Sequence, residues 1–436
     1  MNTYFANLWD SLRTSFWFVP AVLGFIAILG SLLLPEIDDR VPDEWIVWLQ
    51  TTTPAARSTL SAIAAAMMTV AGTVFSITVV TLSLTSQQFG PRLLRSFMLD
   101  FPTQLTIGTF LSTGVYCLLI LRIVEQHEPV SVPHLSVAFA VGLTVASMGL
   151  LIFFVHHVAV LIQAPHIVAA VAQDLDSSIV RLFPDRIGQP SSPDDQTNAT
   201  ANEQRNSLSG DFVEIASLSE GYLQAIDNDG LLHFAEKHNL IIKVLRRPGQ
   251  YISCGDVLGR IWHCEEEDQK VTEKVNEFFI VGMRRTPRQD VECAIDELVE
   301  VAVRSLSPGI NDPFTAINCI DRLRSALGRL AEREIPDALR CDRKGKLRVI
   351  ARPVTFPEVM AAAFNQIRQY GSNCPAVMIR MLEAFESILM HTSRPGDRQA
   401  VLNHADMVMR AAENAITEKS DLDDVREAHG RLASHS

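Results

Sequence analysis

The sequence lacks the short motifs by which most enzyme classes are recognised. It contains no P-loop, no GxGxxG dinucleotide fingerprint, no HExxH zinc motif and no GxSxG nucleophile elbow. It also lacks a basic stripe, since 38 Lys and Arg residues stand against 50 Asp and Glu residues, for a net charge of -12. Phosphate backbones require clustered cations, so nucleic acid is not expected as a partner. These absences weigh against an enzyme but leave the question of an activity open.

Paired cysteines are absent as well. The seven cysteines are scattered without a CxxC pair, so neither a zinc knuckle nor a thioredoxin-like motif is indicated, and we expect no metal and no cofactor. Six of the seven follow residue 183, which suits a reducing compartment. The N-terminus shows no cleavable signal pattern, because residues 35–37 make a poor cleavage site. We therefore expect the first apolar run to be a retained anchor.

Four long apolar runs dominate the first third of the chain. They cover residues 16–34, 59–84, 105–121 and 132–162, and contain no Lys, Arg, Asp or Glu. A hydrocarbon core about 30 Å thick needs about 20 such residues in a helix, and a helix satisfies its own backbone in lipid. A soluble protein with four buried core helices is the disfavoured alternative. The sequence predicts an α-helical membrane domain with four transmembrane helices, followed by a cytosolic α+β domain.

The orientation rests on the even number of spans, which puts both termini on the same side. The loops carry few Lys and Arg residues, so the positive-inside rule gives only a small margin. The cysteine-bearing C-terminal part suits the cytosol. We therefore expect a multi-pass protein whose N- and C-termini are cytoplasmic.

Composition divides the chain further. We expect residues 1–183 to form the four-span transmembrane domain and residues 184–210, rich in Ser, Asn, Asp and Pro, to form a flexible linker. Strand-like runs between turn residues predict a small β-rich module over residues 211–286. Apolar residues at helical spacing predict a mostly helical cytosolic region over residues 287–425, with a frayed tail over 426–436.

Small and hydroxyl-bearing residues recur along one face of the second span and again in the third. They are Thr69, Gly72, Ser76, Ser83 and Gln87 in the second span, and Thr109 and Thr113 in the third. Such residues let helices pack closely. They could equally line a hydrated path, either within one chain or at the axis of an oligomer. We treat these seven as candidate path-lining residues, with helix packing as the alternative.

Two further groups of polar residues lie at the ends of spans. Arg92 and Arg95 follow Gly90-Pro91, where they could neutralise an anion or bind lipid phosphate, or simply anchor the topology. His156 and His157 lie near the end of the fourth span, and ionisable groups within a membrane are functional candidates. Interfacial snorkelling is the alternative for the histidines. The four residues form a candidate polar mouth.

A third polar cluster surrounds two predicted helix starts in the cytosolic part. Its members are Arg284, Arg285, Gln289, Asp290, Asn311 and Asp312. Helix N-termini attract anions, so these residues are a candidate cytosolic ligand site. Helix capping and turn chemistry are the alternative, and Asp290 and Asp312 alone do not make a general acid–base pair.

Several long motifs, in this order, resemble those of one family. They are TVAGTVFSITVVTLSLTSQQFGPRLLRSF, FFVHHVAVLIQ, RRTPRQD and SLSPGINDPFTA. The family consists of bacterial predicted membrane proteins known as domain of unknown function 2254, and the resemblance covers nearly the whole chain. It implies a bacterial inner-membrane protein with four spans and a cytosolic domain. It implies no catalytic residues and no established activity.

Three functions are compatible with these features. The hydroxyl stripes favour an oligomeric channel or transport-like protein with a cytosolic regulatory domain. The alternative is a membrane-anchored sensor or scaffold whose cytosolic domain binds a small anion or a protein. An unrecognised membrane enzyme comes third, because catalytic motifs are missing. The partners expected are the lipid bilayer, further copies of the chain, and a small anion or ion.

Overall fold

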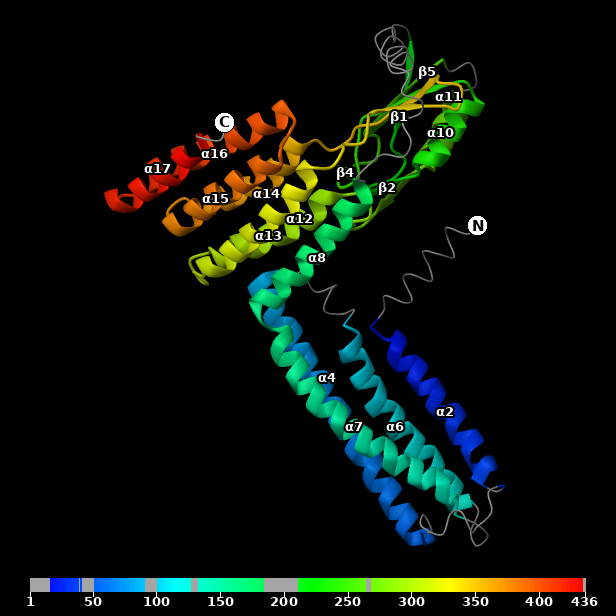
Figure 1. Ribbon diagram of the computed structural model, residues 1–436. Coiled ribbons are helices and arrows are strands. Elements are labelled where there is room, and N and C mark those ends of the chain that lie inside the picture. The colour runs from blue at the N-terminus through cyan, green and yellow to red at the C-terminus, as the bar shows by residue number, and fades with distance from the viewer. Residues whose placement is uncertain are drawn as a thin grey trace. The chain divides into compact units, whose positions relative to one another are not determined.

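The structure is a computed structural model that describes residues 16–38, 40, 51–90, 100–126, 132–183, 211–263 and 268–433. The chain forms two compact units, Met1–His166 (unit 1) and Ile167–Ser436 (unit 2). Unit 1 contains long apolar helices, and unit 2 combines helices with two β-sheets (Figure 1). The expected order of an apolar helical part followed by a mixed part is therefore confirmed. Arg92, Arg95 and the linker 184–210 lie outside the described residues.

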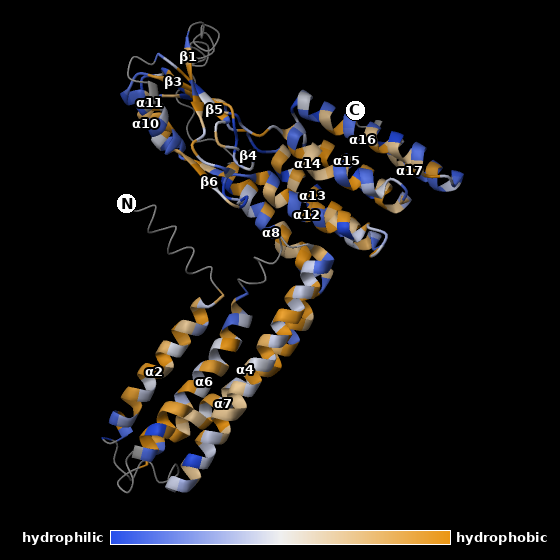
Figure 2. Ribbon diagram, turned by 180° about the vertical axis from the view of Figure 1, so that it is seen from behind, coloured by the Kyte–Doolittle hydropathy of each residue, from blue (hydrophilic) through white to orange (hydrophobic). Residues whose placement is uncertain are grey.

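Unit 1 holds four helices that are long and apolar enough to cross a membrane, counted among the described residues. They are α2 (Phe18–Asp38), α4 (Thr53–Phe89), α6 (Phe101–Gln126) and α7 (His134–Leu161). The ribbon of these helices is coloured largely as hydrophobic in Figure 2. Helix α4 begins before the apolar run 59–84, with Pro54 in its first turn, and Gly90, with a φ of 109°, ends it.

Helix α6 forms the centre of unit 1. Half of its apolar window is buried, against 11% to 28% for the other three helices. Phe110, Tyr116 and Ile120 are almost fully buried along it. At Gly108 a Cβ atom would lie 2.9 Å from the Cα of Pro20, so the close contact with α2 requires a glycine.

A buried carboxylate joins α2 to α7. Asp38, at the end of α2, is 9% exposed and accepts hydrogen bonds of 3.1 Å from the backbone N–H groups of Leu135 and Ser136. These N–H groups belong to the first turn of α7, where no intrahelical partner exists and a negative charge is favoured. The contact holds the end of α2 against the start of α7, although the two helices are distant in sequence.

Two sheets form the β part of unit 2. The five-stranded sheet has the order β1-β5-β3-β8-β7, and the three-stranded sheet the order β4-β2-β6. Their strands are β1 (Phe212–Ala216), β2 (Gly221–Ile226), β3 (Ile241–Val244), β4 (Tyr251–Ile252), β5 (Val257–Trp262), β6 (Phe279–Gly282), β7 (Leu339–Cys341) and β8 (Leu347–Ile350). Strand β8 pairs with β3 in parallel, so the sheet includes strands from the region expected to be mostly helical. Helices α10 (Asn228–Lys237) and α11 (Asp268–Asn276) complete this part.

The helical region of unit 2 consists of seven helices among the described residues. They are α8 (Ala164–Leu182), α12 (Val291–Ser305), α13 (Pro313–Ala331), α14 (Phe356–Gly371), α15 (Pro375–His391), α16 (Pro395–Ala415) and α17 (Lys419–Ala433). Pro at the first helical positions and side-chain caps begin several of them. Helix α17 continues through residues expected to be a frayed tail, because Val425, Ala428 and Leu432 are buried.

Helix α8 contributes its apolar face to unit 2, although we expected residues up to 183 to belong with the spans. Ile167, Leu175 and Ile179 are buried on that face. Asp176 forms an ion pair with Arg329 of α13, and Arg181 donates to the carbonyl of Pro287 at 2.7 Å. The chain between α8 and β1 thus connects two elements of the same unit.

A fragment beginning at residue 164 should therefore fold in water better than one beginning at residue 211. Each buried aliphatic side chain of α8 contributes about 1.5–3 kcal/mol, and the shorter fragment would expose the surface that they cover. Chemical denaturation and size-exclusion chromatography compare the two.

Point variants in the longer fragment provide the control. Leu175→Ala should cost about 2–5 kcal/mol, whereas Val180→Ala, on the exposed side of α8, should change stability by less than about 0.5 kcal/mol. Equal stability of the two fragments would contradict this assignment of α8.

The stability of unit 2 should also fall in mild acid because of His404. This side chain is 6% exposed in α16, and burial, together with the charge of Arg368, lowers the pKa of His404 to about 4 from an ordinary 6.5. The folded state therefore favours neutral imidazole, a contribution that is complete above pH 6.5 and is lost as the pH falls toward 4. Its full size is about 3 kcal/mol. Chemical denaturation of the parent and of His404→Leu between pH 4 and pH 6.5 measures this contribution. If the free energy of unfolding depends on pH equally in both proteins, the prediction is refuted.

Candidate functional site

The polar stripe of α4 lies on the surface of unit 1. Thr69, Gly72, Ser76, Ser83 and Gln87 are all exposed, while the opposite face of the helix is buried. The hydroxyls of Thr69 and Ser76 each donate to the carbonyl four residues earlier, at 2.9 Å. A Cβ atom at Gly72 would meet nothing within 4 Å among the described residues. The stripe thus faces out of the unit and does not line a path between its helices.

The stripe of α6 lies elsewhere. Thr109 is half-buried and donates to the carbonyl of Leu105 at 2.8 Å. Thr113 is 0% exposed, and its hydroxyl has no hydrogen-bond partner among the described residues. The structure therefore does not bring the two sets of candidate path-lining residues together, since one is exposed and the other lies in the core.

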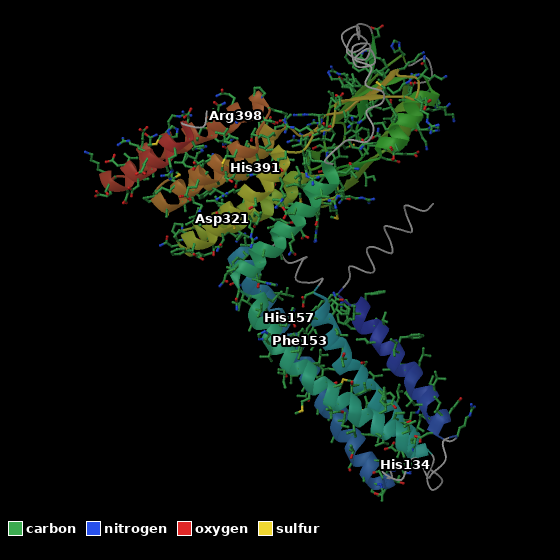
Figure 3. The ribbon with its side chains drawn as sticks, in the orientation of Figure 1. His134, Phe153, His157, Asp321, His391 and Arg398 are labelled. Carbon is green, nitrogen blue, oxygen red and sulfur yellow. The ribbon has the colours of Figure 1, made fainter. Side chains whose placement is uncertain are left out.

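The histidines of the candidate polar mouth also separate. His156 is exposed, whereas His157 Nε2 lies 3.0 and 2.9 Å from the two carboxylate oxygens of Asp100. Phe153, one turn earlier on α7, stacks on the His157 ring with 5.6 Å between centroids (Figure 3). Asp100 also accepts from the backbone N–H and hydroxyl of Thr103, at 3.0 and 2.5 Å.

The Asp100–His157 pair joins the start of α6 to the end of α7. Its side chains are 13% and 20% exposed, so the pair is partly shielded from water. Sequence reasoning found His157 but missed Asp100, because the two lie 57 residues apart. The described residues contain no group of three potential ligands that could hold a metal ion.

Most of the candidate cytosolic ligand site is occupied by contacts within the chain. Arg285 donates from Nε to Asp290 at 2.8 Å and from a terminal nitrogen to Asp296 at 2.5 Å. Burial opposes the charge of Arg285, but Asp290 and Asp296 raise its pKa above the ordinary value. Asp290 caps α12 by accepting from the N–H of Cys293 at 3.2 Å. Gln289 pairs with the N–H and carbonyl of Ile226, both at 3.0 Å.

The remaining members lie at the other end of α12, or on the surface. Arg284 is exposed. Asn311, with a φ of 50°, and Asp312 follow the C-terminal end of α12, and Asp312 caps α13 through the N–H groups of Phe314 and Thr315 at 3.1 and 3.2 Å. A helix of this length separates its ends by about 22 Å. The six residues therefore do not form one pocket, and their contacts are those of caps and turns.

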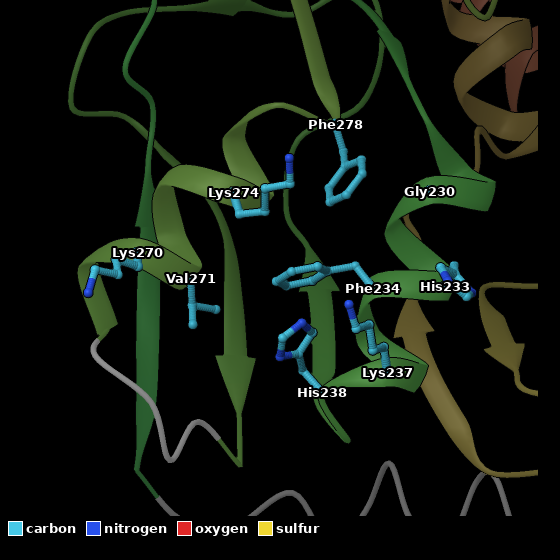
Figure 4. Close-up of a pocket in the computed structure, with 9 residues that line it drawn as sticks. All are labelled: Gly230, His233, Phe234, Lys237, His238, Lys270, Val271, Lys274 and Phe278. Atoms are coloured by element: carbon cyan, nitrogen blue, oxygen red, sulfur yellow. The ribbon is translucent and has the colours of Figure 1, made fainter.

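A pocket of about 460 Å³ lies between α10 and α11 (Figure 4). Three lysines and two histidines surround an aromatic and aliphatic floor, and no carboxylate is among the described lining residues. The lining residues are Gly230, His233, Phe234, Lys237, His238, Lys270, Val271, Lys274 and Phe278.

The pocket geometry combines rings with positive charge. The ring of Phe234 lies 4.5 Å from that of His238 and 5.8 Å from that of Phe278, between centroids. Lys274 contacts Glu277 at 2.5 Å, and both side chains are more than half exposed. Sequence reasoning missed this pocket, although His233 with Lys237, and Lys270 with Lys274, show the spacing of four that places basic residues on one helix face.

Comparisons with known proteins agree with the apolar helices. The family described as predicted membrane protein (DUF2254) matches residues 13–387. An uncharacterized protein of Mycobacterium tuberculosis and one of Mycobacterium bovis are each 30% identical over 427 residues, covering 94% of this chain and 79% of the relative. No solved structure matches. The chain belongs to the DUF2254 family of predicted membrane proteins.

Proposed function

We propose that this protein is a membrane-anchored sensor whose unit 2 binds a small anion in the α10–α11 pocket. The observation that supports the proposal is the set of five basic side chains around an aromatic floor, with no carboxylate among the described lining residues, in a chain of net charge -12. The proposal places the protein in a bacterial inner membrane, with both termini and unit 2 in the cytoplasm. The even number of spans and the cysteines of unit 2 support that orientation.

The pocket has the size and chemistry of a small-molecule site. Ligand pockets commonly measure about 300–1,000 Å³ and are mainly apolar, with a few polar groups that orient the ligand. Here the floor is formed by Phe234, Val271 and Phe278, while Lys237 and Lys274 supply cations from the two helices. Cations gathered at one site raise the local concentration of anions, although Lys274 also contacts Glu277. An anion with an apolar or aromatic part could contact both the apolar floor and the lysine side chains.

Charge reversal at the pocket should abolish ligand-induced stabilisation. We expect inorganic pyrophosphate or adenosine diphosphate to raise the melting temperature of the full chain in detergent. Lys237→Glu and Lys274→Glu should weaken this binding by about tenfold or more, or about 1.4 kcal/mol each. Lys344→Glu, an exposed lysine in the β7–β8 turn, serves as the matched control. The proposal fails if neither compound stabilises the parent, or if the control loses the effect equally.

A second candidate function is supported by the exposed stripe of α4. Because Thr69, Gly72 and Ser76 face out of unit 1, any path that they line has to lie between copies of the chain. Small residues exposed on a membrane helix allow the close helix–helix contacts of an oligomer, and the hydroxyls bonded to their own carbonyls can lie in such a contact without cost. An oligomeric channel or transport-like protein, lined or sealed by α4, is this second candidate.

The mass of the detergent-solubilised protein tests the second candidate. We expect the parent to be oligomeric and Gly72→Leu to dissociate it, because leucine at this position clashes only with a neighbouring copy. Gly149→Leu on α7 is the matched control, since a Cβ atom there also meets nothing within 4 Å among the described residues. Mass photometry distinguishes the states. A monomeric parent would rule out a path along the α4 stripe.

A further inference from the structure

Three large apolar side chains are exposed at one end of the helical region of unit 2. Phe314 at the start of α13 is 77% exposed, Ile310 in the loop before it is 43% exposed, and Tyr370 near the end of α14 is 59% exposed. The ends of α12 and α14 lie side by side, because a Cβ atom at Gly371 would be 3.3 Å from the side chain of Leu306. These three side chains form what we term the apolar end.

Hydrogen bonds stabilise the loop that contains Ile310 and leads to Phe314. The N–H groups of Ile310 and Asn311 donate to the carbonyl of Ser307 at 3.1 and 2.8 Å. Asp312 donates from its N–H to the carbonyl of Ser305 at 2.7 Å, and its carboxylate accepts from the N–H of Phe314 at 3.1 Å. The backbone therefore holds the two apolar side chains outward, and their exposure is a property of the fold.

Helix α8 shows which end of the helical region this is. Asp176 pairs with Arg329, and just beyond the C-terminal ends of both helices Arg333 donates to the carbonyl of Phe183 at 2.5 Å. Both partners of the second contact follow those of the first contact in sequence, so α8 and α13 run in the same direction. The starts of α8 and α13 lie about 18 and 24 Å before the Asp176–Arg329 pair, so Phe314 and the first turn of α8 are at the same end.

The first turn of α8 is tied to the membrane by the chain itself. Only Ile162 and Gln163 separate Leu161, the last residue of the apolar helix α7, from Ala164, the first residue of α8. This connection reaches at most about 11 Å. The chain therefore connects the helical region to the apolar helix α7 at the end that carries Phe314.

We propose that Ile310 and Phe314 insert into the headgroup region of the bilayer that the chain spans, with Tyr370 at its surface. Amphipathic aromatic side chains favour this boundary, and apolar side chains gain by leaving water there. Three side chains cover far less than the roughly 800 Å² per partner of a stable protein interface, so a second copy of the chain is the weaker occupant. This contact is independent of the ligand pocket and of the α4 stripe.

Fluorescence quenching by lipid tests the proposal on the full chain. The variant Phe314→Trp is reconstituted in vesicles of phosphatidylcholine with or without brominated acyl chains, and the spectrum of the parent is subtracted. The matched control is Met390→Trp, which is 66% exposed near the end of α15, where His391 contacts Glu332 at the opposite end of α13. We expect brominated lipid to quench about half of the emission added at position 314.

The emission added at position 390 should stay unquenched and red-shifted, as for tryptophan in water. Equal quenching at both positions, or none at position 314, would overturn the proposal. A blue-shifted but unquenched signal at position 314 would also overturn it, because the side chain would then be covered by protein. Each substitution replaces an exposed apolar side chain by another, so the fold should be retained in both variants.

Discussion

A backbone N–H or C=O group that loses water inside a bilayer has to be paired within its own helix, and unit 1 is organised by that requirement. Its hydroxyls follow the same rule, as when Thr69 donates to the carbonyl of Ala65. The strongest polar contacts between helices therefore lie at the helix ends, with Asp38 on the start of α7 at one end and Asp100–His157 at the other. Between these ends, α6 contacts its neighbouring helices through apolar side chains. The fit of these side chains therefore determines which helices pack against each other.

Unit 2 uses its charges differently. Arg247 donates to Glu292 at the start of α12 and to Glu358 at the start of α14, at 2.7 and 2.9 Å, and only 13% of its side chain is exposed. Arg247 thus links the starts of α12 and α14. Removing one partner of such a shielded pair would leave a buried charge without its counter-charge, so we expect the pairs to stabilise this arrangement. The basic side chains around the α10–α11 pocket differ from these buried pairs, because no carboxylate is among the described residues that line it.

Local signals in the sequence predicted the helices and their caps. The apolar runs and Asp312 specify structure through residues within a few positions, so the four helices of unit 1 and the start of α13 were predicted. Features that depend on distant segments were not. The direction of the α4 stripe depends on which face α6 covers, and Asp100 reaches His157 only after two helices have packed. The pairing of β8 was missed for the same reason, because its parallel partner β3 lies about 100 residues earlier.

The junction between the units shows why such distant contacts matter for function. From the composition alone, the polar stretch 184–210 would have separated a free cytosolic domain from its anchor. Because α8 is buried in unit 2 and follows α7 after two residues, unit 2 is instead connected to the last membrane helix by a short segment. For the sensor that we propose, a connection of two residues would pass a change in unit 2 to α7, which a long flexible linker would not.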